Sequence, residues 1–299
     1  MSLTYIAAYD GTDASRSAVQ FAVELARVER ASVVAAHVYP FMAPVHVRGA
    51  LPAADRELQQ DARAAGRAVL DGLDVDGIAR RVLACGSPAH VLHDLAVEER
   101  ASLVAVGVTH HEHVGRLVPG SVGAKLMHGA PCPVAAVPAG ATIGPIATIG
   151  VAYDGGPESR RALLSAERLA ASVGARIVMI GAYDLPVYAG PALATSWDID
   201  PAMRDAFASE LREAADAITS VPVEIRLVLG PAGATIAEAT RDDIDLLVTG
   251  SRGYGPIRSV LLGGTSRHLV DHAACPVVVV PRASGAEIDR EPEQAVAQA

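Results

Sequence analysis

Aromatic residues are scarce in this sequence. They make up 4% of its 299 residues, whereas hydrophobic residues of all kinds make up 51%. The core must therefore be built from Ala, Val, Leu and Ile, which suits sheets covered by Ala-rich helices better than aromatic-packed β-sandwiches. Cysteine is also rare, and Cys85, Cys132 and Cys275 share no CxxC spacing. This excludes a disulfide framework and fits a reducing cytoplasm.

Long apolar runs and basic runs are absent as well. No apolar run approaches the roughly 20 residues that a membrane helix needs, and the first residues lack the regions of a signal peptide. We therefore expect a cytoplasmic protein that does not bind membranes. The formal net charge of −9 argues against a broad nucleic-acid-binding surface. Backbone amides could still hold an anion locally, because net charge does not report them.

What the sequence does contain is a long internal repeat. The segment YIAAYDGTDASRSAVQFAVELA from Tyr5 returns as IGVAYDGGPESRRALLSAERLA from Ile149. Likewise, PGSVGAKLMHGAPCPVAAVP ending at Pro138 returns as LGGTSRHLVDHAACPVVVVP ending at Pro281. A unit of about 140 residues is too long for a solenoid repeat and matches a whole domain.

The repeat predicts two domains with the same order of elements, one over residues 1–140 and one over residues 146–283, followed by a polar tail over residues 284–299. In the first copy we predict strands at 4–9, 32–39, 78–84, 102–107 and 133–138, with helices at 15–29, 53–71, 88–99 and 121–129. Helical crossovers between strands imply parallel pairing with right-handed connections. The predicted fold class is α/β: two tandem doubly wound domains, each a five-stranded parallel sheet in order 3-2-1-4-5 with helices on both faces.

Such a sheet places a ligand crevice at the carboxyl ends of its strands, where the winding direction reverses. For the predicted order, this point lies between the first and fourth strands. The first strand ends at Asp10 or Asp154, and the fourth ends at Gly107 or Gly250. The topology alone should therefore bring these residues together. For the two aspartates, an Asx turn that only shapes the backbone is the alternative to a ligand contact.

The loop after the fourth strand of the second copy is rich in glycine, at positions 250, 253, 255, 263 and 264. Glycine lets the backbone adopt positive φ and approach a ligand closely. The loop enters a helix predicted near 264–272, whose first amides favour an anion, and Thr265 and Ser266 add hydroxyl donors. This makes the loop a candidate phosphate cradle that lacks the lysine of a P-loop. A glycine-rich turn that binds nothing is the alternative.

These motifs resemble the universal stress protein family in its tandem-domain form. The nucleotide-binding signature of that family, G-x2-G-x9-G-[ST], is matched at its glycines by Gly250, Gly253 and Gly263. The opening YDG and the closing CPVVVVP are also similar to the family. The resemblance implies an adenine nucleotide alpha hydrolase-like fold and a stress-response regulator that binds ATP. For a metal, Mg²⁺ carried by the nucleotide is favoured over a protein-only site.

The resemblance also implies individual site residues. The adenine is expected to contact Asp154 and Ala182 in the second copy, and Asp10 and Val38 in the first. The implied phosphate-binding positions are Gly250, Gly253, Gly263 and Gly264 in the second copy, and Gly107, Gly120 and Ser121 in the first. The Thr265 hydroxyl joins the binding residues of the second copy on its place at the start of the predicted helix, and not on the resemblance.

Each copy departs once from the signature. Gly264 stands at the [ST] position of the second copy, which keeps the amide and loses a hydroxyl, and His110 replaces the second glycine of the first copy. A Cβ at position 110 conflicts with a backbone angle that only glycine adopts easily, so the second copy is expected to be the better site. The cluster His110–His113 offers zinc ligands, but adjacent side chains in a loop rarely converge. A solvated loop and a phosphate contact are the alternatives.

No nucleophile–base pair and no carboxylates placed for hydrolysis are recognisable, so we expect binding without catalysis and leave slow ATPase activity open. A protein-interaction scaffold with a vestigial nucleotide site is the alternative. We expect Ser15 and Ser159 to cap helices, and Cys132 and Cys275 to be buried small residues. The last strand of each copy is a short apolar edge that must be covered or paired. The family dimerises through this strand, so the two copies are expected to pair with each other, and a homodimer of the chain is left open.

Overall fold

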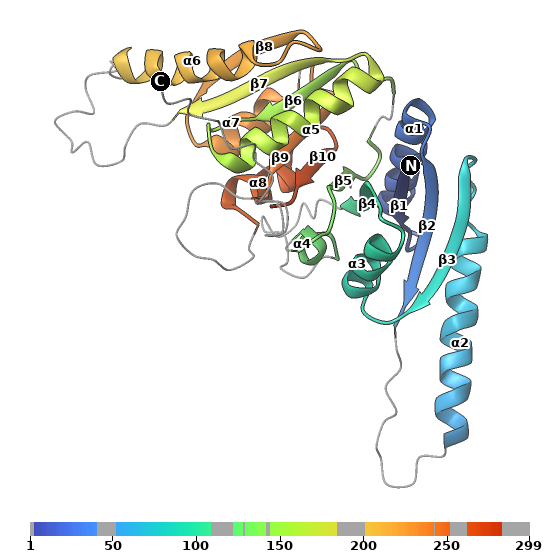
Figure 1. Ribbon diagram of the computed structural model, residues 1–299. Helices are drawn as coiled ribbons and strands as arrows, with labels where there is room; N and C mark the ends of the chain where they lie inside the picture. The colour runs from blue at the N-terminus through green and yellow to red at the C-terminus, as the bar shows by residue number, and fades with distance from the viewer. Residues whose placement is uncertain are drawn as a thin grey trace, which may run out of the picture.

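The three-dimensional structure is a computed structural model that describes residues 3–40, 52–108, 122–127, 129–141, 144–183, 201–241, 243–251 and 262–282. Within these residues the chain forms two halves with the same order of strands and helices (Figure 1). None of the described helices is long and apolar enough to cross a membrane.

The first half follows the predicted order closely. Its elements are β1 (Thr4–Ala8), α1 (Asp13–Glu29), β2 (Ser32–Tyr39), α2 (Pro52–Asp71), β3 (Ile78–Cys85), α3 (Pro88–Glu98), β4 (Leu103–Val108), α4 (Val122–Met127) and β5 (Val134–Pro138). The second half contains β6 (Thr148–Ala152), α5 (Pro157–Val173), β7 (Arg176–Tyr183), α6 (Pro201–Asp216), β8 (Val223–Leu229), α7 (Ala232–Ala239), β9 (Leu246–Gly250), α8 (Gly264–His272) and β10 (Val277–Val280).

All ten strands belong to one sheet in the order β3-β2-β1-β4-β5-β10-β9-β6-β7-β8. Within each half every pairing is parallel, and the predicted order 3-2-1-4-5 is confirmed in both halves. The halves join where β5 meets β10 in the middle of the sheet (Figure 1). This pairing is antiparallel, with Val134 opposite Val279 and Ala136 opposite Val277. Neither apolar closing strand is therefore left as an exposed edge.

Helices cover both faces of the sheet because both faces of its strands are apolar. Ile6 and Ala7 are adjacent in β1 and point to opposite faces, and both are fully buried. One core layer packs against α1, α2, α5 and α6, and the other packs against α3, α4, α7 and α8. Cys132 and Cys275 are buried in the second layer, which confirms the prediction made for them. Burial raises the pKa of each thiol to about 12.

The helix starts differ from the prediction. Ser15 and Ser159 do not cap their helices, because the N-cap positions are Thr12 in α1 and Gly156 in α5. Ser15 lies one turn further in, where its hydroxyl donates to the Thr12 carbonyl at 2.8 Å and accepts from the Asp10 amide at 3.2 Å. Ser159 donates to the Gly156 carbonyl at 2.9 Å in the same way. The prediction placed the cap too late because it did not include the Asp-Gly turn in the helix start.

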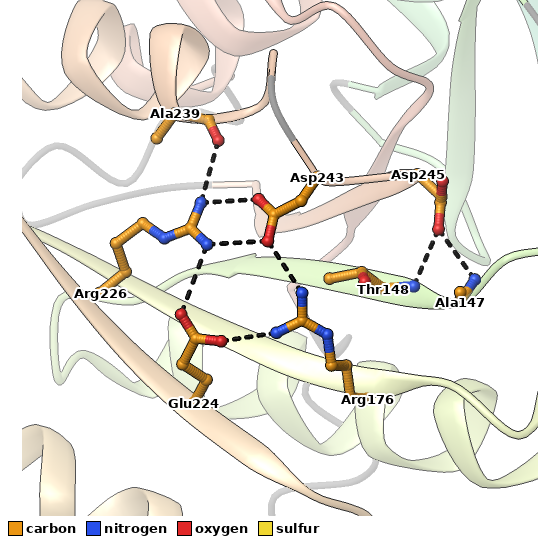
Figure 2. A network of polar contacts seen from close by, with 8 residues as sticks. All are labelled: Ala147, Thr148, Arg176, Glu224, Arg226, Ala239, Asp243 and Asp245. Atoms are coloured by element: carbon orange, nitrogen blue, oxygen red, sulfur yellow. Dashed lines mark hydrogen bonds and ion pairs between the residues drawn. The ribbon is translucent and has the colours of Figure 1, made fainter.

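A polar network at the amino ends of β7 and β8 holds the outer strand of the second half (Figure 2). Arg226 donates to both oxygens of Asp243, at 2.9 and 3.0 Å, and Arg176 donates to the same carboxylate at 2.8 Å. Glu224 on β8 pairs with both arginines. The network lies at the end of the sheet opposite the carboxyl edge, so it supports the fold of the second half and not its crevice.

Candidate functional site

The carboxyl ends of β6, β7 and β9 open onto a pocket in the second half. Its volume is about 490 Å³ measured out to open solvent, and its wall includes Asp154, Ala182, Gly250, Thr265 and Ser266. Asp154 follows β6, Ala182 is near the end of β7, and Gly250 ends β9, whereas Thr265 and Ser266 belong to the first turn of α8. Five of the residues proposed from the sequence for a nucleotide therefore line one pocket.

Asp154 shapes the backbone at the start of this pocket. Its Oδ1 accepts a hydrogen bond from the Gly156 amide at 2.9 Å, which is the Asx turn that the sequence left as an alternative. The residue is exposed, and no hydrogen bond to its Oδ2 is found among the residues that the structure describes. One carboxylate oxygen serves the turn, and the other is free of protein partners in that part of the chain. The turn and a ligand contact are therefore compatible.

Asp10 makes the equivalent turn in the first half. The Oδ1 atom of Asp10 accepts two hydrogen bonds from Thr12, one from the amide at 3.0 Å and one from the side-chain hydroxyl at 2.6 Å. Partial burial raises the pKa of Asp10, but the hydrogen bonds from Thr12 and Ser15 outweigh it and hold the pKa below its ordinary value. Asp10 is therefore an anion at neutral pH.

Gly107 near the end of β4 and Gly250 at the end of β9 have a packing role that does not depend on a ligand. A Cβ at Gly107 would lie 2.3 Å from the carbonyl carbon of Ala14, in the first turn of α1. A Cβ at Gly250 would lie 2.9 Å from the backbone of Glu158, in the first turn of α5. Each strand end thus packs directly on a helix backbone, which only glycine allows. Sequence reasoning assigned these glycines to a ligand and missed this contact.

The two ends of the glycine-rich loop meet beside the pocket. The amide of Ser251 donates to the Val280 carbonyl at 2.9 Å, and the amide of Gly263 donates to the Ser251 carbonyl at 2.8 Å. Helix α8 then begins with Gly263 as its N-cap and without a side-chain cap. Its first amides are the groups that favour an anion. Gly253 and Gly255 lie between these ends, outside the described residues.

Several pocket residues were missed by sequence reasoning, among them Thr249 and two residues of α7. Ala232 and Ile236 come from α7 and form the apolar side of the pocket. Because α7 follows the third strand of its half and packs on the same sheet face as α8, the predicted topology contained the signal that could have found them. A pocket that combines an apolar wall with the polar start of a helix suits a ligand with a flat apolar part and an anionic part.

In the first half, the structure describes only some of the proposed residues. Asp10 follows β1, and Gly107 lies in β4. Val38 of β2 pairs with Ala84 of β3, just as Ala182 of β7 pairs with Val228 of β8. Val38 and Ala182 therefore hold equivalent positions in the two halves. Gly120, Ser121 and the cluster His110–His113 lie outside the described residues. Within the described part of the chain, no group of three or more His, Cys, Asp or Glu residues could hold a metal ion.

Comparison with known proteins identifies the family of the chain. The model of the Universal stress protein family matches the chain twice, over residues 3–138 and 145–281. The chain belongs to the Universal stress protein family. It carries two copies of the family domain, and the matched ranges meet between β5 and β6.

Some similar proteins match less than half of the chain, and others match nearly all of it. The chain is 36% identical over 142 residues to a universal stress protein of Thermus aquaticus, covering 44% of this chain and 97% of the relative. It is 29% identical over 157 residues to the stress response protein NhaX of Bacillus subtilis, covering 44% of this chain and 95% of that one. A crystal structure of a universal stress protein from Archaeoglobus fulgidus covers 94% of this chain and 98% of its own, with 19% identity and a TM-score of 0.66. At 19% identity, the structural similarity shows that the two chains share a fold.

Proposed function

We propose that the chain binds ATP in the pocket of its second domain and acts as a nucleotide-dependent regulator of the stress response. The observation that carries the proposal is the pocket itself. It combines an exposed carboxylate at Asp154, a small residue at Ala182 and the first turn of α8 at Thr265. The carboxylate suits hydrogen bonding to an adenine, the small residue leaves space for its ring, and the start of the helix suits an anionic phosphate chain.

The chemistry of the lining residues suggests how the ligand lies. Asp154 and Ala182 would hold the adenine, with Ile236 as an apolar neighbour, because they offer a carboxylate, space for a ring and an apolar surface in the same pocket. The phosphates would lie at the first turn of α8, where Gly264 and Thr265 offer backbone amides and a hydroxyl. A Mg²⁺ ion would arrive with the nucleotide, because Mg²⁺ usually takes phosphate oxygens as ligands.

We propose that the protein binds the nucleotide without turning it over. Hydrolysis needs a base beside the terminal phosphate, and the sequence offers no recognisable candidate in the glycine-rich loop or at the start of α8. We also propose that the protein is cytoplasmic and that bound nucleotide changes which partner it binds. A second copy of the chain, forming a homodimer, is one such partner.

The experiment is mass spectrometry of the natively purified chain, followed by calorimetric titration with ATP. We expect bound ATP or AMP after purification and an affinity in the micromolar range, which corresponds to about 8 kcal/mol of binding free energy. Gly253→Val should weaken ATP binding at least about tenfold, because it places a side chain where the signature brings backbone to phosphate.

Gly144→Val is the matched control for this titration. A Cβ at Gly144 meets no atom within 4 Å, and the residue lies between the two domains, so its affinity should equal that of the parent chain. A parent chain without any nucleotide binding would instead favour an interaction scaffold with a vestigial pocket.

A further inference from the structure

Two neighbouring hydroxyl residues, Thr249 and Ser266, line the pocket of the second domain where β9 meets α8. Both are buried, with 4% and 3% of their surface exposed. The Ser266 hydroxyl donates to the carbonyl of Gly250 at 2.6 Å, and the Thr249 hydroxyl lies 3.4 Å from that of Ser266. A short buried hydrogen bond therefore joins the first turn of α8 to the last residue of β9.

This bond closes the base of the glycine-rich loop together with the hydrogen bond from the Gly263 amide to the Ser251 carbonyl. The residues before the loop are thus tied to the residues after it at two points. Because α8 begins at Gly264, the two bonds determine where its first amides stand relative to β9. Hydrogen bonds in a buried setting hold such an arrangement more tightly than exposed ones.

The first domain lacks this arrangement. Val106, which precedes Gly107 in β4, and Gly123, in the first turn of α4, stand at the equivalent positions. A Cβ at Gly123 would lie 3.1 Å from Cγ2 of Val106, so these positions are neighbours in both domains. Neither residue carries a hydroxyl, and a valine–glycine pair occupies the same place in the core. The hydroxyl pair is therefore not needed to fill that space.

We propose that Ser266 is a positioning residue for nucleotide phosphate, and that its replacement by Gly123 lowers the phosphate affinity of the first domain. The inference rests on the proposed binding of ATP. Ser266 does not have to contact the nucleotide, because its hydroxyl is already engaged by the Gly250 carbonyl. Its effect is to hold the amides of α8 in the orientation that an anion requires.

Two variants test the proposal. Ser266→Ala removes the hydroxyl and keeps the Cβ, whereas the double variant T249V/S266G installs the pair that the first domain uses. Affinities for ATP and for adenosine are measured by calorimetry, with Tm as a record of folding. We expect ATP to bind about tenfold more weakly to both variants, as for the loss of one well-placed hydrogen bond. Adenosine should bind within about twofold of the parent value, because it has no phosphate.

Thr240→Val is the matched control. The Thr240 hydroxyl is equally buried and donates to the Ala237 carbonyl at the same 2.6 Å, but Thr240 follows the last residue of α7 and is not among the residues that line the pocket. Its loss should lower Tm and leave both affinities unchanged.

Each contrary outcome identifies a different error. Unchanged ATP affinity in both variants, or an equal loss for ATP and adenosine, overturns the positioning role of Ser266. A parent chain that binds neither ligand overturns the proposed function itself.

Discussion

The Oδ1 atom of Asp154 lies 2.9 Å from the amide nitrogen of Gly156 and accepts its hydrogen bond. The residue proposed to bind adenine is thus also part of the turn between β6 and α5. Asp10 has the same position in the first domain and accepts the amide of Thr12 at 3.0 Å. A single substitution at either aspartate therefore changes the backbone and the proposed site together.

Two substitutions of Asp154 separate these effects. Asp154→Ala should lower the free energy of unfolding by about 1 kcal/mol through loss of the turn, and it should also weaken ATP binding. Asp154→Asn keeps an oxygen for the Gly156 amide and should restore the stability. Thermal unfolding and calorimetry on both variants check this. Full ATP affinity in Asp154→Ala would show that the carboxylate serves the turn alone.

Gly264→Ser should strengthen ATP binding by the second domain. A Cβ at Gly264 meets no atom within 4 Å, so a serine fits without strain and restores the hydroxyl of the family signature. One added hydrogen bond to a charged phosphate corresponds to a gain of about tenfold. Gly264→Ala adds the Cβ without the hydroxyl and should bind ATP as the parent does. Equal affinities for the serine and alanine variants would contradict a phosphate at this position.

The two domains should bind nucleotide unequally. Titration of the parent chain at pH 8 should give about one ATP per chain, because His110 replaces a signature glycine in the first domain. His110→Gly should bring the stoichiometry toward two. Asp154→Ala combined with His110→Gly identifies the new site, since its remaining binding must belong to the first domain. Two sites of equal affinity in the parent chain would show that His110 is harmless.

Asp243 should make stability depend on pH in the acid range. Its hydrogen bonds with Arg226 outweigh burial and hold the pKa of its carboxyl below the ordinary value of 3.8. The stabilisation by this carboxylate is therefore complete above the pKa that the group has in the unfolded chain. It is lost as the pH falls through the lower pKa that the group has in the folded protein. Between about pH 6 and about pH 3, the free energy of unfolding, measured with denaturant, should fall less for Asp243→Asn than for the parent. An identical loss in both proteins would contradict a role for this carboxylate.

The size of the Asp243 effect at neutral pH should be modest. Its side chain is 34% exposed, and solvent screening reduces the contribution of such pairs to about 1 kcal/mol or less. Glu238→Gln is a suitable control because its pair with Arg241 is far more exposed, at 73% and 62%. The control should change the free energy of unfolding by less than about 0.5 kcal/mol.

Much of the fold was predictable because it repeats and because its strands are apolar on both faces. Strand order followed from helical crossovers and a switch point, which in turn predicted that Asp154 and Gly250 would line one pocket. The start of α1 was not predictable in the same way, since Thr12 and Ser15 can both cap and only backbone geometry selects between them.

Close packing explains the other differences. The contact of Gly107 with the Ala14 backbone depends on how a strand end meets a helix that begins nearly a hundred residues earlier in the chain. A one-dimensional pattern records the glycine without recording what lies against it. The same holds for Ser266, which the sequence offered as a phosphate donor and which instead donates to the Gly250 carbonyl.

The antiparallel contact between β5 and β10 has a further consequence for any partner of this protein. Because β5 and β10 run in opposite directions, the amino end of β5 lies beside the carboxyl end of β10, with Val134 opposite Val279. Asp10 and Asp154 follow the carboxyl ends of strands that run parallel to β5 and to β10, respectively, so the carboxyl ends of the two domains point away from each other at the centre of the sheet. We therefore expect a partner that docks at the carboxyl ends of one domain to respond to the ligand of that domain alone.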